Sequence, residues 1–161
     1  MEHPRLGRLV TAALLVTPLR LALGCAVLIA SRVAGAGSTP ASLAFGTLAG
    51  CTLFVIVNDP RRRFWRGRRG EPLPVPLGAR FISRRELLRA ALFPSTVGVG
   101  VLAAVAIALD RPTLAAGFGG VLAGMGLASL AAGVEVLLRE RQAHCEYYTE
   151  TNGYRVFELR N

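Results

Sequence analysis

Four long apolar runs dominate the sequence and decide what it can fold into. They cover residues 9–31, 41–57, 90–109 and 114–138. At a rise of about 1.5 Å per residue, helices of this length cross a hydrocarbon core about 30 Å thick. The runs lack the polar residue at every third or fourth position that a soluble amphipathic helix carries. The sequence therefore predicts an all-α membrane protein with four transmembrane helices in an antiparallel bundle.

The composition of these runs favours close packing between helices. Hydrophobic residues make up 52% of the chain, but aromatic residues only 7%, and 18 residues are Gly. Small residues allow two helix backbones in a membrane to approach each other. They recur at every fourth position in two ladders, Ser42, Gly46 and Gly50 in the second run and Gly120, Gly124, Ala128 and Ala132 in the fourth. Such ladders serve either internal packing or a homo-oligomer.

The arginines predict the orientation of the bundle. The 19 basic residues are all Arg, and sixteen of them lie before the first run, in the loop 58–89 or its borders, or after the fourth run. Only Arg32 and Arg111 lie in the other two turns. Because basic loops stay in the cytoplasm, we expect cytoplasmic N- and C-termini and a cytoplasmic loop 58–89. The absence of Lys is typical of a GC-rich bacterial gene, so the expected location is the bacterial inner membrane.

The start of the third helix has a local signature. Ser83 and Glu86 have the spacing of a capping box, in which each side chain accepts from a free backbone amide of the first turn. Basic and apolar residues alternate over residues 84–92, which indicates that this helix begins at the membrane interface. Pro94 follows one turn inside the apolar run and predicts a kink.

The C-terminal residues 144–161 have the pattern of a β-hairpin, separate from the transmembrane domain of residues 1–143. Asn152 and Gly153 stand between two β-prone runs, which is the strongest short signal for a two-residue turn. That turn predicts a register with Tyr148 opposite Phe157. An isolated hairpin is only marginally stable in water, so we expect it to dock on the loop, the membrane or a partner.

Arg20 lies in the middle of the first apolar run, twelve positions from both Arg8 and Arg32. A charge at that depth is expensive and needs a partner, for which Glu135 and Asp59 are the candidates. An alternative places the start of the helix at Thr17, so that residues 6–16 lie on the membrane surface and Arg20 is interfacial. The sequence leaves both interpretations open.

The loop after the second run combines six arginine residues with two adjacent aromatic residues. They are Arg61, Arg62, Arg63, Phe64, Trp65, Arg66, Arg68 and Arg69. Trp and Phe beside Arg anchor a helix end at the interface and attract anionic headgroups. A specific pocket for an anionic lipid or polyprenyl phosphate is the alternative. Nucleic acid is not expected, because no folded reader or long basic tail accompanies the arginines.

No residue set in the sequence points to catalysis, a metal or a cofactor. His144 and Cys145 do not match a zinc-ligand spacing, and no Ser/His/Asp or Cys/His set is evident. We therefore expect a non-enzymatic helper or scaffold subunit that binds anionic lipid and a protein partner or a second copy. The alternative is a small carrier or lipid-phosphate flippase subunit in which Arg20 contacts the anion.

Overall fold

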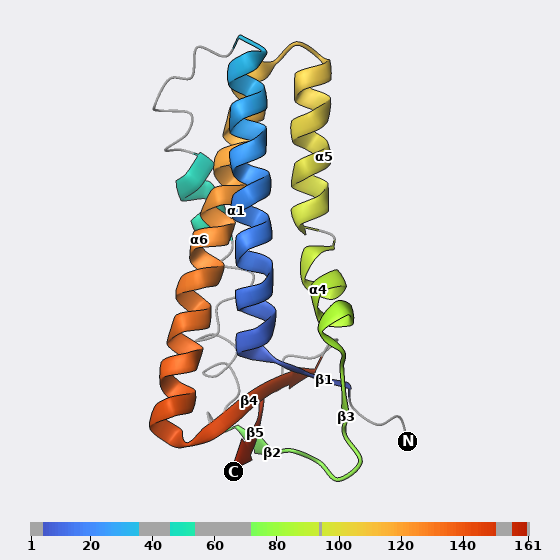
Figure 1. The fold of residues 1–161 in the computed structure, drawn as a ribbon, viewed down its shortest axis with the longest axis vertical. Helices are drawn as coiled ribbons and strands as arrows, with labels where there is room; N and C mark the ends of the chain where they lie inside the picture. Colours follow the sequence, from blue (N-terminus) through green and yellow to red (C-terminus); the bar gives the residue numbers. More distant parts are fainter. Residues whose placement is uncertain (1–4, 36–45, 54–71, 94, 151–155, 161) are drawn as a thin grey trace.

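Helices form a long shaft, and a small sheet lies at one of its ends (Figure 1). The computed structural model describes residues 5–35, 46–53, 72–93, 95–150 and 156–160. In the described part of the chain, the shaft consists of α1 (Leu9–Val33), α4 (Arg84–Leu92), α5 (Ser95–Ala108) and α6 (Pro112–Ala143), together with a helical stretch at residues 46–53. The strands are β1 (Arg5–Arg8), β2 (Leu73–Pro74), β3 (Arg80–Phe81), β4 (Cys145–Glu150) and β5 (Val156–Arg160).

The first helix is continuous from Leu9 to Val33. Pro18 lies inside it, and the preceding Thr17 donates its hydroxyl to the carbonyl oxygen of Ala13 at 2.9 Å. Thr17 is therefore an interior helical residue, and the alternative with a separate surface segment before it is wrong. At about 1.5 Å per residue, the 25 residues extend about 37 Å, which exceeds a hydrocarbon core.

The third apolar run forms two helices instead of one. α4 begins at Arg84 with Ser83 as its N-cap, and the capping box with Glu86 is formed as the sequence predicts. α5 follows at an angle of 49° to α4. The predicted kink is therefore a break between two helices, and Pro94 itself lies outside the described residues.

Glycines bring the helical stretch 46–53 against α6. A Cβ at Gly46 would collide with the backbone of Gly117, and a Cβ at Gly50 would collide with that of Val121. A Cβ at Gly124 would in turn meet the carbonyl oxygen of Thr47. Gly46 and Gly50 of the first ladder and Gly124 of the second therefore serve packing inside the chain, while Ser42 lies outside the described residues.

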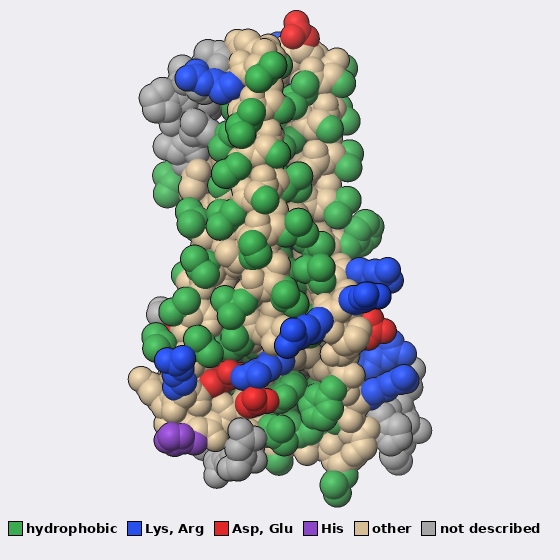
Figure 2. Space-filling view, in the orientation of Figure 1, with side chains coloured by type: hydrophobic (Ala, Val, Ile, Leu, Met, Phe, Trp, Pro, Cys, Tyr) green, Lys and Arg blue, Asp and Glu red, His purple; other side chains and the backbone are tan. Residues whose placement is uncertain are grey.

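The shaft is apolar outside and partly polar inside, the reverse of a soluble bundle. Leu19, Val101 and Leu130 are exposed on its surface, whereas Arg20 and Ser129 are buried. Figure 2 shows apolar side chains along most of its length. Two helices, α1 and α6, are long and apolar enough to cross a membrane, and the bent pair α4 and α5 makes a third if counted as one span. These helices indicate a membrane protein. The prediction of four spans is not established, because the second run is described only at residues 46–53.

The predicted C-terminal hairpin is part of a larger sheet. β4 and β5 pair antiparallel with Tyr148 opposite Phe157, as the Asn-Gly turn predicts. The sheet has five strands in the order β2-β5-β4-β1-β3, so the hairpin lies between strands from the N-terminus and from the basic loop. The chain is therefore mostly helical with a small sheet, and the all-α description is too simple.

A compact apolar cluster joins the sheet to the ends of the helices. Val10 of α1 and Val136 of α6 are buried against Cys145, Tyr147 and Val156 of the hairpin. These five residues make the sheet a continuation of the helical shaft. Burial of side chains of this size contributes about 1.5–3 kcal/mol each relative to exposure.

Candidate functional site: a buried arginine and a basic belt

Arg20 crosslinks three helices inside the shaft. Its side chain is 3% exposed. The Nε atom donates to Thr96 Oγ1 at 2.9 Å, and Nη1 donates to Ser129 Oγ at 2.7 Å. The Nη2 atom donates to the carbonyl oxygen of Ala91 at 3.2 Å and lies 3.5 Å from Ser95 Oγ. One guanidinium on α1 thus binds α4, α5 and α6 at once.

The break between α4 and α5 explains why an arginine suits this position. In an unbroken helix, the carbonyl oxygen of Ala91 would accept from the amide four residues later. The break interrupts that ladder and leaves carbonyl oxygens at the negative end of α4, where a cation is favourable. Arg20 supplies both the donor and the charge. A planar guanidinium reaches several acceptors in fixed directions, which an ammonium group does not.

The candidate partners of Arg20 from the sequence have different positions. Glu135 forms an ion pair with Arg139 at 2.9 Å, one turn along α6. No ion pair joins Arg20 and Glu135, both of which the structure describes. Asp59 lies outside the described residues. A search for an opposite charge misses the hydroxyl groups of Thr96 and Ser129, although these are among the few polar residues of their runs.

Exposed arginines gather at the sheet end of the shaft and form what we call the basic belt. It consists of Arg5, Arg80, Arg84, Arg85, Arg89 and Arg141, all exposed. Figure 2 shows basic side chains concentrated there, between the apolar shaft and the sheet. The opposite end carries Arg32 and Arg111. The arginine residues predicted to bind lipid in the loop, together with Phe64 and Trp65, lie outside the described residues.

α4 contributes half of the basic belt and is amphipathic. Arg85 and Arg89 are exposed one turn apart, whereas Leu87 is buried on the opposite side of the helix. A Cβ at Gly7 of β1 would collide with the side chain of Leu87, so this leucine fixes α4 against the sheet. Two like charges one turn apart destabilise a helix by about 0.2–0.5 kcal/mol unless an anion neutralises them.

Arg8 and Glu140 form a second polar cluster, which the sequence does not reveal. Glu140 is 6% exposed and accepts from Arg8 Nη2 at 3.1 Å and from the amide of Tyr147 at 2.9 Å. Arg8 also pairs with Glu146 at 3.1 Å. Burial lowers the pKa of Arg8, but the two carboxylates more than offset it, so the pKa is raised. This cluster ties the start of α1 and the end of α6 to the hairpin.

The tyrosines of β4 predict a loss of stability at alkaline pH. Burial first, and then Cys145 for Tyr147 and Glu146 for Tyr148, raise both pKa values from 10 to about 12. Below pH 10, both tyrosines stay protonated in the folded and in the unfolded chain, so the free energy of unfolding does not depend on their titration. Between about pH 10 and 12 the unfolded chain loses protons that the folded chain retains, so the free energy of unfolding falls.

Unfolding of the detergent-solubilised protein as a function of pH measures this effect. The variant with Tyr147→Phe and Tyr148→Phe should show a flatter profile above pH 10, because the groups that titrate are gone. Tyr148→Phe alone also removes the 2.7 Å hydrogen bond to Glu146, so it should lower stability at neutral pH as well. An equally steep alkaline loss in the double variant would contradict the assignment.

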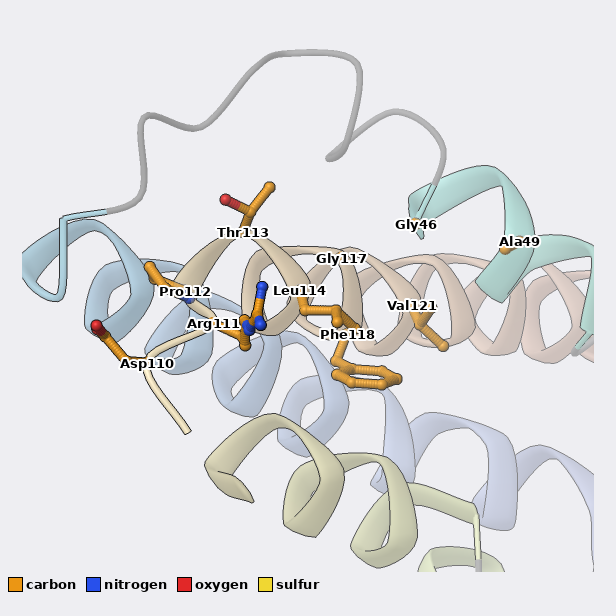
Figure 3. Close-up of a pocket in the computed structure, with 10 residues that line it drawn as sticks. All are labelled: Gly46, Ala49, Asp110, Arg111, Pro112, Thr113, Leu114, Gly117, Phe118 and Val121. Atoms are coloured by element: carbon orange, nitrogen blue, oxygen red, sulfur yellow. The ribbon is translucent and has the colours of Figure 1, made fainter. Parts of the chain in front are cut away.

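A groove lies at the end of the shaft opposite the sheet (Figure 3). Its volume is about 670 Å³, within the range of about 300–1,000 Å³ for ligand pockets. Leu114, Gly117, Phe118 and Val121 of α6 line it, together with Gly46 and Ala49 of the helical stretch 46–53. Asp110 and Arg111 of the turn between α5 and α6, with Pro112 and Thr113 at the start of α6, complete the lining.

Comparison with known proteins adds no family to this description. No protein-family model, no curated protein and no solved structure matches the chain.

Proposed function

We propose that this protein is a non-enzymatic helper or scaffold of the bacterial inner membrane, with both termini in the cytoplasm. Its basic belt binds anionic lipid headgroups and holds the small sheet at the membrane surface for a protein partner. The observation that carries this proposal is the amphipathic helix α4, with exposed Arg84, Arg85 and Arg89 beside the apolar shaft. The sequence carries six further arginine residues between positions 61 and 69, which lie outside the described residues.

The strength of the lipid interaction follows from the number of arginines. A basic residue near an anionic membrane surface contributes about 1 kcal/mol, so the three arginines of α4 together contribute about 3 kcal/mol. The capping box at Ser83 fixes the start of α4 and thereby the position of these side chains. Salt weakens such an interaction, because exposed charges are screened over about 10 Å.

The contacts of Arg20 favour this proposal over a carrier that uses Arg20 to bind an anion. Thr96, Ser129 and the carbonyl oxygen of Ala91 accept from its three nitrogen atoms. An incoming anion would have to displace these acceptors. The arrangement suits a structural crosslink between helices better than a transient contact with a substrate.

Lipid binding to variants of α4 tests the proposal. We expect Arg89→Gln to weaken phosphatidylglycerol binding by the purified protein in mild detergent about fivefold, and neutralisation of Arg84, Arg85 and Arg89 together to weaken it about a hundredfold or more. The difference should shrink at high salt. Lipid bound per protein, measured by native mass spectrometry, reports both effects.

Arg32→Gln is the matched control, because Arg32 is equally exposed but lies at the end of the shaft remote from the basic belt. It should leave phosphatidylglycerol binding close to that of the wild type. Equal binding by the wild type and the triple variant of α4 would show that the described part of the basic belt does not bind lipid.

A further inference from the structure

The groove opposite the sheet has apolar walls that begin at the end of the shaft. Leu114 and Val121 lie one and three turns into α6 and belong to its apolar segment. Leu114 is 56% exposed, so the groove is continuous with the apolar surface of the shaft. In a membrane, such a surface is in contact with acyl chains. The occupant that fits these walls is therefore the acyl chain of a lipid.

The outer end of the groove carries two adjacent opposite charges. Figure 3 shows Asp110 at the extreme end of the groove with its side chain directed away from Arg111, which lies further in, and Val121 further along the groove. Both side chains are exposed, and among the residues that the structure describes neither makes an ion pair. Asp110 has a positive φ of 55°, which holds the tight turn between α5 and α6.

This charge pattern distinguishes between classes of headgroup. A phosphate group matches Arg111, and an ammonium group matches Asp110. A headgroup with a phosphate and no cation would bring negative charge near Asp110. A quaternary ammonium has no N–H to donate to a carboxylate, whereas a primary ammonium has three.

We propose that this groove binds a phospholipid with a phosphate and a primary ammonium, such as phosphatidylethanolamine. Its acyl chain lies against Gly117 and Val121, its phosphate pairs with Arg111, and its ammonium pairs with Asp110. This site differs from the basic belt in place and in headgroup class. Lipid binding in the groove and lipid binding by the basic belt can therefore be tested independently.

Gly117 allows the groove to be filled without disturbing the packing of α6. A Cβ at this position would have no heavy atom within 4 Å, so Gly117→Leu places a side chain in the open groove. Gly98 of α5 has equally open surroundings and does not line the groove, so Gly98→Leu is the matched control. Both changes remove one helical glycine and add the same side chain.

Binding of defined lipids to the purified full-length protein tests the proposal. We expect the wild type and Gly98→Leu to bind dioleoylphosphatidylethanolamine at least tenfold more tightly than dioleoylphosphatidylcholine in native mass spectrometry. Gly117→Leu should weaken phosphatidylethanolamine binding about tenfold. Phosphatidylethanolamine binding unchanged by Gly117→Leu would overturn the proposal, as would a wild type that binds both lipids equally.

Two surface variants test the headgroup contacts and do not depend on the groove being filled. Asp110→Asn keeps a residue that tolerates a positive φ and should abolish the preference for phosphatidylethanolamine over phosphatidylcholine. Arg111→Gln should weaken binding of both lipids. Retention of the preference in Asp110→Asn would overturn the assignment. The triple variant of α4 should bind phosphatidylethanolamine at this site as the wild type does, which separates this proposal from that for the basic belt.

Discussion

Arg20→Ala is expected to lower the free energy of unfolding by about 3 kcal/mol or more. Hydrogen bonds to charged groups contribute about 1.5–3 kcal/mol each, and Arg20 makes three that are no longer than 3.2 Å. Removal also leaves a cavity where α1, α5 and α6 meet. A charge at the centre of a membrane helix costs about 2.5–3.5 kcal/mol, and Arg20→Ala removes this cost. The gain offsets part of the stability lost with the hydrogen bonds and through the cavity.

Double-variant cycles identify the partners of Arg20. Thr96→Val removes the acceptor of Nε, so the pair Arg20→Ala and Thr96→Val should lose less stability than the sum of the single variants. Glu135→Ala is the control. Glu135 lies on α6 in a partly exposed ion pair with Arg139, so its replacement should cost about 0.5 kcal/mol or less and be additive with Arg20→Ala.

Chemical unfolding in detergent micelles measures the wild type, the three single variants and the two double variants. Strong non-additivity between Arg20 and Glu135, with an additive cycle for Thr96, would contradict this assignment. It would mean that Arg20 stabilises the protein through Glu135 and not through the hydroxyl group of Thr96. A loss below about 0.5 kcal/mol for Arg20→Ala would place this side chain in the class of surface residues.

Features with a local physical cause could be predicted from the sequence. The apolar runs correctly place α1 and most of α6, since length and hydropathy alone decide whether a helix suits a membrane. The capping box at Ser83 depends only on two side chains of one turn. The pairing of Tyr148 with Phe157 depends only on the length of the turn between the strands.

Features that depend on distant segments could not be predicted. β2 and β3 have two residues each, too few for any alternation of polar and apolar side chains to be visible. β2 pairs with the free edge of β5 in the hairpin, whereas β3 pairs with the free edge of β1, which itself pairs with β4. The buried Glu140 likewise finds its basic partner in Arg8, 132 positions away.

The candidate site was predictable in part. The central position of Arg20 in an apolar run indicates a structural or functional role. Nothing in the sequence shows that the C-terminal end of α4 lies next to its guanidinium. Pro94 predicts a bend, yet the free carbonyl oxygen of Ala91 follows only when the two helices are placed in space. The sequence predicts an opposite charge near Arg20, and the described contacts add neutral oxygen atoms of Thr96, Ser129 and Ala91.

Gly124→Ala is expected to lower the free energy of unfolding by about 3 kcal/mol, the upper end of the usual cost of overpacking. A Cβ at this position would collide with the carbonyl oxygen of Thr47 and lie 3.0 Å from the amide nitrogen of Cys51. Both are backbone atoms, which cannot move aside as a flexible side chain can. The helical stretch 46–53 would have to separate from α6.

Gly98→Ala isolates this steric effect from helix propensity. Both variants gain about 0.5–1 kcal/mol because alanine is the better helix former, but only Gly98 has no heavy atom within 4 Å of the added Cβ. Gly98→Ala should therefore be neutral or stabilising in chemical unfolding. The thiol of Cys51, which donates to the carbonyl oxygen of Gly124 at 3.3 Å, gives a second measurement. Separation of the helices in Gly124→Ala should accelerate its labelling by a membrane-permeant thiol reagent, whereas an unchanged labelling rate and unchanged stability would mean that these helices do not pack here.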